Sequence, residues 1–300
     1  MQTVYYEQGK LMKIAIIGGA GKMGRWLTGF LQKEGHEIVV SDTDKAGLSN
    51  VQESLGVAAA SSAKAMAEAD VVVVAVNSDR FEETVIELSS HVRPGQIILD
   101  ITSIKEQPVD LMHQYLKKAT VLGTHPLFGP GAKDLASQNV VLTPTNEAES
   151  ALAKKVMNYL QKHNARVTLM TPRKHDEMMA VVLGLAHFIA IVAAGTLAEI
   201  GKQAELKAIG GSTFRVLTTL VESVISEDPE LYATLQMKLP YVTEVEELFQ
   251  MQAAKWAEIV KNQDRQAFVK QMTVLKYKFA SNNTNFGQAY ENMYKIMEWL

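Results

Sequence analysis

Two short polar segments hold the residue types that can move protons, and each follows an apolar run. Residues 100–105 read DITSIK, and residues 123–130 read GTHPLFGP. The imidazole of His125 can accept a proton near neutral pH. Ser103 can orient His125 or a substrate hydroxyl. Alone, Ser103 can equally be a helix cap and His125 a turn residue, but together at neighbouring strand ends they predict an active site.

A glycine-rich segment after the first apolar run predicts a dinucleotide site. Gly19, Gly21 and Gly24 form the pattern G-x-G-x-x-G. The first glycine allows a tight turn, the second lets the backbone approach a pyrophosphate, and the third packs a helix on a strand. The helix that follows offers N–H groups and its positive dipole end to phosphates. The alternative is a glycine turn with a structural role only. The predicted cofactor residues here are Gly19, Ala20, Gly21, Lys22, Met23 and Gly24.

Two further residues belong to the predicted cofactor site. Asp42 ends the second apolar run, eighteen residues beyond the last glycine of the motif. A carboxylate there accepts hydrogen bonds from ribose hydroxyls and repels a 2′-phosphate, which favours NAD over NADP. The alternative is that Asp42 caps the next helix, a role that Asp44 can also fill. Val76, at the end of a valine run that begins at residue 71, completes the site.

The first half of the chain alternates β-branched runs with amphipathic stretches. Such continuous apolar runs are typical of strands covered on both faces of a parallel sheet. The predicted strands are 13–17, 37–41, 71–76, 96–100, 119–123, 139–143 and 165–170. Helices lie between them, one of which begins after Ser78 and ends before Pro94. The pattern predicts a doubly wound Rossmann-type domain over residues 12–172, after an extension of residues 1–11.

The second half contains no predicted strand. Apolar residues recur at helical spacing through 173–199, 206–226 and 242–261, and then from about 264 to the end. We therefore predict an all-helical domain over residues 173–300. Met178–Leu197 is long and uncharged enough to span a membrane, but a helix that is apolar on every side is also typical of a buried core or dimer helix. We predict the buried helix.

Composition narrows the class of protein. The 300 residues are 47% hydrophobic and 21% charged, which excludes a disordered chain. Thirty basic and 33 acidic residues give 30 − 33 = −3, so no basic excess favours nucleic acid. The absence of cysteine excludes disulfides and thiolate metal sites and fits a reducing compartment. With no secretory signal and no metal-ligand spacing, we expect a cytoplasmic protein without a metal.

The chain resembles the prephenate dehydrogenase family, most closely its archaeal-type members, from Met12 almost to the end. The matching pieces are residues 19–24, 100–105, 124–130, Leu142-Thr143-Pro144, His175-Asp176 and Leu185-Ala186-His187. The resemblance implies NAD-dependent oxidative decarboxylation of prephenate to 4-hydroxyphenylpyruvate in tyrosine biosynthesis. It implies that His125 accepts the proton of the ring C4 hydroxyl as hydride leaves C4. Ser103 matches the serine that helps to hold this hydroxyl and histidine.

Two positions depart from the family pattern. Gly184 stands where many members carry the first histidine of the helical entry motif, and His187 fits the second. Thr219 stands where many members carry the arginine that binds the substrate carboxylate. We therefore assign carboxylate recognition to Arg215, Lys105 or Lys133. His187 is predicted to line the substrate pocket, with a core residue as the alternative.

Other functions and the assembly are also open to prediction. An arogenate dehydrogenase is the nearest alternative. A 3-hydroxyacid dehydrogenase would carry a catalytic lysine on the first long helix, and Met178–Leu197 has none. A non-catalytic NAD-sensing protein would need neither Ser103 nor His125. The apolar helices of the second half, and the dimers formed by related family members, predict a homodimer through the helical domain.

Overall fold

The computed structural model describes residues 11–298. The chain divides into two compact units, of which the first ends at Met178 and the second begins at Met179. The predicted boundary lies a few residues earlier, at 172/173, so that helix α7 (Pro172–Met179) falls almost wholly in the first unit. The expected extension of residues 1–11 lies, apart from Leu11, outside the described residues.

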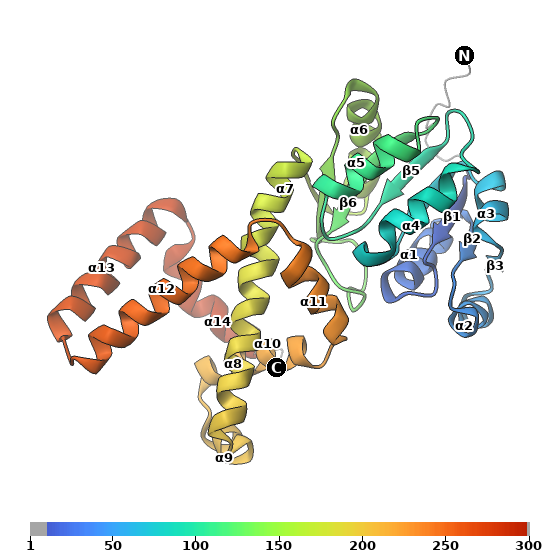
Figure 1. Ribbon diagram of the computed structural model, residues 1–300. Helices are drawn as coiled ribbons and strands as arrows, with labels where there is room; N and C mark the ends of the chain where they lie inside the picture. The colour runs from blue at the N-terminus through green and yellow to red at the C-terminus, as the bar shows by residue number, and fades with distance from the viewer. Residues whose placement is uncertain (1–10, 299–300) are drawn as a thin grey trace. The chain divides into compact units, whose positions relative to one another are not determined.

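The first unit is built on one eight-stranded sheet (Figure 1). Its strands are β1 (Lys13–Ile17), β2 (Glu37–Ser41), β3 (Ala58–Ala59), β4 (Val71–Val74), β5 (Ile97–Asp100), β6 (Thr120–Pro126), β7 (Asn139–Thr143) and β8 (Arg166–Leu169). Their order is β3-β2-β1-β4-β5-β6-β7-β8. The chain thus proceeds outward from β1 in both directions, which confirms the predicted doubly wound topology.

One pair of strands corrects the expectation of a parallel sheet. β6 and β7 are antiparallel, with Gly123 opposite Thr143, whereas the other neighbouring strands are parallel. The reason lies in the connection: residues 127–138 contain no helix, and a parallel return normally needs a helical crossover. β3 was not predicted, because its two alanines carry no β-branched signal.

Helices cover both faces of this sheet. They are α1 (Lys22–Lys33), α2 (Lys45–Leu55), α3 (Ser62–Glu68), α4 (Ser78–Ser89), α5 (Glu106–Tyr115) and α6 (Glu147–Lys162). Buried side chains of α3, α4 and α5, among them Met66, Phe81 and Met112, form one core with the sheet. Leu31 and Leu48 of α1 and α2 belong to a second core, on the other face. The valine-rich strands are therefore covered on both sides, as their composition predicts.

The second unit is helical throughout its described residues. It contains the π-helical turn η1 (Ala180–Leu185), α8 (Ala186–Ile200), α9 (Gln203–Ile209), α10 (Ser212–Ile225), α11 (Pro229–Lys238), α12 (Val242–Lys261), α13 (Arg265–Asn282), the short 3₁₀ helix η2 (Phe286–Gln288) and α14 (Ala289–Met297). α10 packs against α8 and α14, while α12 packs against η1 and α13. The predicted helix 242–261 is confirmed, but the predicted stretch 206–226 is broken at Gly210 and Gly211, and the stretch after 264 is broken before η2.

The apolar helix of the second half is not covered by its own chain. The described residues contain one helix, Pro172–Ile200, that is long and apolar enough to cross a membrane, and only 22% of its most apolar window is buried. Val181, Val182 and Val192 are exposed. Within the described residues this helix is therefore largely exposed, and its burial in a core or a dimer stays a prediction.

Candidate active site

The glycine turn follows β1 and leads directly into α1. The N–H groups of Gly18 and Gly19 donate to the Ser41 carbonyl at the end of β2, at 2.8 and 3.1 Å. Gly21 is the N-cap residue of α1, and no side chain caps this helix. Backbone N–H groups at an uncapped helix start are a ready site for phosphate.

Close packing explains why the turn needs glycines. A Cβ atom on Gly24 would lie 2.2 Å from the Gly18 carbonyl oxygen and 2.9 Å from Gly19 Cα. A Cβ atom on Gly19 would lie 2.8 Å from Val40 Cβ, whereas one on Gly21 would meet only the Gly18 oxygen, at 3.3 Å. Gly24 therefore lets helix and strand approach, as predicted for the third glycine, and Gly21 leaves room over the turn. Gly19 was predicted to serve the tight turn, but its close contact is with Val40 of β2.

Asp42 and Val76 lie beside this turn. The Ala20 N–H donates to Asp42 Oδ2 at 2.8 Å, and the Asp44 N–H donates to Asp42 Oδ1 at 3.0 Å. Asp44, not Asp42, caps α2, because its carboxylate accepts the Gly47 N–H. Val76 follows β4, with its Cγ1 atom 3.0 Å from where a Cβ on Gly18 would stand. These residues fit the adenosine end and the switch point of a dinucleotide site.

His125 is the inner member of a chain of three buried side chains. It lies near the end of β6, and its Nδ1 atom is 2.8 Å from Nε2 of His175 on α7. Nδ1 of His175 is 2.7 Å from Asp176 Oδ1. The exposed fractions of the three residues are 4%, 0% and 1%. The two Asp176 oxygens also accept the N–H groups of Lys105 and Glu106, at 2.8 and 2.9 Å.

Lys105 corrects one prediction. Its side chain is fully buried, and its Nζ atom donates to Asp100 Oδ1 and, at 3.1 Å, to Thr102 Oγ1. Burial lowers the pKa of Lys105, and the charge of Asp100 opposes this shift. An ammonium group with no exposed surface cannot reach a substrate carboxylate, so the predicted carboxylate-binding role of Lys105 is wrong. The lysine instead holds the segment between β5 and α5 together.

The electrostatics of the site keep His125 neutral. Burial is the main cause that lowers the pKa of His125 well below its usual range, and His175 and Lys105 lower it further. Burial also lowers the pKa of His175, against the effect of Asp176. A neutral imidazole retains one ring nitrogen with a free lone pair, so His125 can act as a proton acceptor at neutral pH.

The remaining predicted residues of this unit lie as follows. Ser103 is half-buried between β5 and α5, and no hydrogen bond joins it to His125 among the described residues. Its orienting role stays a prediction. Lys133 is exposed in the connection between β6 and β7. Because β1, β4, β5 and β6 are parallel, the glycine turn, Val76, Ser103 and His125 do share one edge of the sheet, as predicted.

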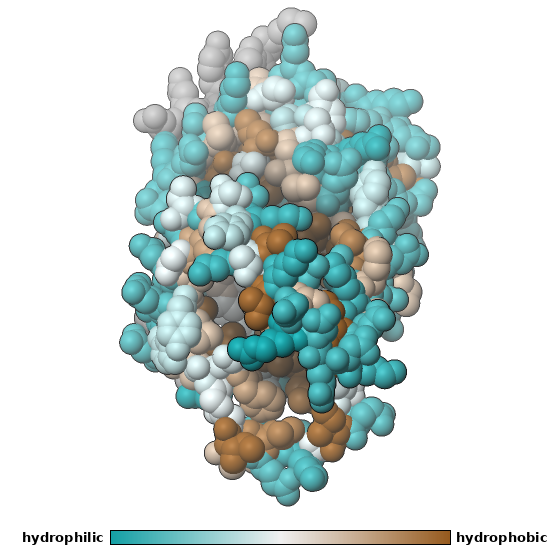
Figure 2. Space-filling model, turned by 90° about the vertical axis from the view of Figure 1, so that its left-hand side faces the viewer, coloured by the Kyte–Doolittle hydropathy of each residue, from teal (hydrophilic) through white to brown (hydrophobic). Residues whose placement is uncertain are grey.

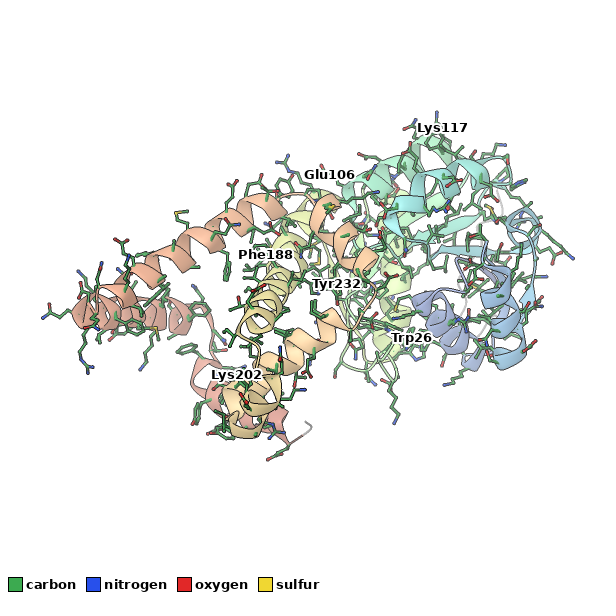
Figure 3. All side chains as sticks on the ribbon, turned by 60° about the horizontal axis from the view of Figure 1, so that its bottom comes forward. Trp26, Glu106, Lys117, Phe188, Lys202 and Tyr232 are labelled. Atoms are coloured by element: carbon green, nitrogen blue, oxygen red, sulfur yellow. The ribbon has the colours of Figure 1, made fainter. Side chains whose placement is uncertain are left out.

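The second unit holds the other two candidates. The ring of His187 packs edge-on against Tyr232 of α11 (labelled in Figure 3), with 4.9 Å between ring centroids. His187 Nδ1 is buried without a hydrogen-bond partner among the described residues, and burial lowers the pKa of His187. Arg215 is exposed on α10. His187 lies two residues beyond η1, and π-helical turns occur frequently at functional sites.

Close packing around Gly184 leaves little room for the histidine that many family members carry at this position. A Cβ atom there would lie 2.8 Å from Val242 Cγ2, and the Gly184 carbonyl accepts a hydrogen bond from Gln236 Nε2 at 3.1 Å. A larger side chain would fit only if the Val242 side chain shifted. The departure from the family pattern at this position is therefore built into the packing of η1, α11 and α12.

Two family models match the chain. Residues 27–169 match the prephenate dehydrogenase nucleotide-binding domain, and residues 171–274 match the prephenate dehydrogenase dimerization domain. The chain belongs to the prephenate dehydrogenase family. This membership decides against the 3-hydroxyacid dehydrogenase group that the order of domains also suggested.

Individual relatives agree with the family. The chain is 36% identical over 274 residues to a Methanocaldococcus jannaschii protein named "Probable arogenate/prephenate dehydrogenase", covering 90% of this chain and 61% of that protein. It is 28% identical to the T-protein of Haemophilus influenzae, covering 86% of this chain and 64% of that protein. The chain thus spans less than two thirds of the length of these relatives.

Solved structures share the fold. Prephenate dehydrogenase from A. aeolicus, crystallised with hydroxyphenyl propionate and NAD+, gives a TM-score of 0.75 at 21% identity, covering 92% of this chain and all of that one. Arogenate dehydrogenase from Synechocystis gives 0.69 at 18% identity, covering 91% of this chain and all of that one. The Rossmann-type unit followed by a helical unit is therefore the architecture of this family.

Proposed function

We propose that the protein catalyses the NAD-dependent oxidative decarboxylation of prephenate to 4-hydroxyphenylpyruvate, a step toward tyrosine. The observation that carries the proposal is His125: a neutral, buried imidazole at the sheet edge where a dinucleotide binds. Membership of the prephenate dehydrogenase family supports the substrate class. An NAD-sensing protein without catalysis would have no use for this histidine or for its buried partners.

In the proposed reaction His125 first accepts a proton and later returns it. His125 accepts the proton of the ring C4 hydroxyl as hydride leaves C4. Loss of the ring carboxylate as CO₂ then makes the ring aromatic. The proton returns from His125 to the phenolate oxygen, so the reaction consumes none overall. Ser103 is proposed to hold the C4 hydroxyl against His125.

NAD is the proposed cofactor, and its role is to accept the hydride. The uncapped start of α1 and the room above Gly21 fit the pyrophosphate. Asp42, held by the Ala20 N–H, is proposed to bind the ribose hydroxyls and to disfavour the 2′-phosphate of NADP. The A. aeolicus structure with NAD+, although related in fold only, supports the same cofactor.

Arogenate is the second candidate substrate. The name of the M. jannaschii relative mentions both arogenate and prephenate, which favours testing both. The two compounds differ in the side chain, which is an amino acid in arogenate and a pyruvyl group in prephenate. With Lys105 excluded, the candidates for carboxylate recognition are Lys133 in the first unit and Arg215 and His187 in the second. Lys133 and Arg215 are both exposed, and neither forms an ion pair with another described residue.

The proposed activity is tested by NADH absorbance after addition of prephenate or arogenate to the protein and NAD+. We expect turnover of at least one. His125→Asn should retain NADH binding, measured by fluorescence, and lose about 10²–10⁴-fold in kcat, the usual cost of removing a general base. Turnover of neither substrate would refute the proposed activity. Wild-type kcat in His125→Asn would remove His125 from the mechanism.

We also propose that the protein forms a homodimer through its second unit. Apolar side chains are visible on the surface of the molecule seen from the side of α12 and α13 (Figure 2). No residue of α13 is buried, and Val269, Met272 and Phe279 are 51–61% exposed. Such surfaces in soluble proteins mark interfaces, and the match to a dimerization domain supports a second copy as partner. Light scattering should give twice 33.0 kDa at micromolar concentration; a stable monomer would contradict the proposal.

A cytoplasmic location, which a cysteine-free chain fits, is proposed as well.

A further inference from the structure

Asp176 anchors one end of the buried chain of side chains. Its carboxylate accepts two backbone N–H groups, from Lys105 and Glu106, in addition to its contact with His175. Because both of its oxygens accept backbone N–H groups, Asp176 is an acceptor toward His175 as well. His175 Nδ1, at 2.7 Å from Asp176 Oδ1, must therefore carry a hydrogen and donate it.

The position of one hydrogen fixes the next. His175 is fully buried, and burial lowers its pKa, so the ring is neutral. A neutral imidazole with a hydrogen on Nδ1 has a bare Nε2. Nε2 of His175 therefore accepts, and its partner at 2.8 Å, Nδ1 of His125, must donate. His125, also neutral, is left with a bare Nε2 atom, and this atom has no protein partner among the described residues.

We propose that His175 is a positioning residue that selects the Nδ1–H tautomer of His125, so that Nε2 of His125 is the atom that accepts the substrate proton. Asp176 sets the direction of this chain of hydrogen bonds. When His125 takes a proton on Nε2, its Nδ1–H still donates to His175, so the bond is kept in both states. The arrangement follows the general rule that the partner of one ring nitrogen decides the function of the other.

The inference rests on the proposed function for the use of Nε2, but the tautomers can be measured without turnover. The first experiment is ¹⁵N NMR of the histidine rings in the full-length protein, with assignments from His125→Asn and His175→Gln. We expect the Nδ1–H tautomer for both His125 and His175. Protonation of either ring on Nε2 in the neutral state would overturn the proposal, whatever the protein catalyses.

Kinetics of two substitutions provide the second experiment. His175→Phe removes the acceptor, whereas His175→Gln keeps an amide oxygen that can accept from His125 Nδ1. We expect kcat to fall about 10²-fold in His175→Phe, the lower end of what general-base catalysis contributes, with KM for NAD+ unchanged and with partial recovery in His175→Gln. Equal losses in the two variants, or a change in KM alone, would refute the positioning role.

A matched control is available in the same unit. His113 pairs with the buried Glu149 at 2.6 Å, at the end of α5 and outside the site. His113→Phe removes a histidine–carboxylate contact of the same kind, and we expect an unchanged kcat and an unchanged tautomer of His125. If His175→Phe does not fold, the tautomers of the wild-type protein still decide the inference. If the wild type oxidises neither substrate, the proposed function fails while the NMR result stands separately.

Discussion

Substitution of Gly24 by alanine tests whether the glycine turn is built to bring helix and strand together. The added Cβ would stand 2.2 Å from the Gly18 carbonyl oxygen, which is backbone and cannot rotate away. Overpacking of this kind costs about 1–3 kcal/mol. Alanine also improves helix propensity by about 1 kcal/mol relative to glycine, so the net effect of Gly24→Ala on folding is a loss of about 0–2 kcal/mol.

Gly29→Ala in the same helix is the matched control. A Cβ atom on Gly29 would meet nothing within 4 Å, so this variant gains the helix propensity without the clash. The propensity contribution cancels between the two variants, and the difference in their free energies of unfolding should be about 1–3 kcal/mol, the overpacking cost alone. Urea denaturation of both variants measures this difference.

Cofactor binding gives a second result from the same pair. The clash would move the Gly18–Gly19 backbone, which faces the proposed pyrophosphate. If the whole cost appeared in binding, the Kd for NADH would rise by about 5–150-fold in Gly24→Ala, and it should not change in Gly29→Ala. Equal stability and equal NADH affinity in the two variants would refute the packing role assigned to Gly24.

Two more predictions concern charge. Asp42→Ala should lower the preference for NAD over NADP, measured as the ratio of kcat/KM values; an unchanged ratio, or a wild type that prefers NADP, would contradict the ribose role. The folded protein should lose stability as the pH falls below about 6.5, the ordinary pKa of histidine. Burial lowers the pKa of His125 and of His175 in the folded state. Below about pH 6.5 the unfolded chain therefore binds more protons than the folded one, which favours unfolding. Above that pH this contribution is fully present. Urea denaturation at pH 7.5 and 5.5 should show the loss, and a smaller loss is expected in His125→Asn.

The sequence was most informative where local pattern and tertiary environment agree. β1, β2 and β7 have the predicted bounds, because β-branched runs flanked by turn residues suit a strand buried on both faces. The glycine spacing likewise predicted the turn, since the same backbone approach is needed in any dinucleotide site. The direction of β7 is not a property of its own residues. It follows from a connection without a helix, which periodicity does not report.

Lys105 and His175 show what residue type alone could not decide. Lys105 stands in a chemistry-bearing segment, and only the position of Asp100, a buried partner at the end of β5, removes it from solvent. An acidic residue five positions earlier was the available signal. His175 lies fifty residues from His125, and only the resemblance singled it out. Its contact depends on where α7 packs, so no spacing rule would have paired the two rings.

The second unit shows the limit of periodicity most clearly. Apolar residues at helical spacing predicted α12 with its observed bounds, because an amphipathic helix must cover one face. The pattern does not indicate whether the same chain or another chain packs against that apolar face. In α13 the apolar side chains of Val269 and Met272 lie more than half exposed, although their spacing is what a helix packed in its own core would show. A partner copy would satisfy the same pattern, so the sequence can predict a buried face for these helices without predicting which chain covers it; the proposed homodimer would supply that cover.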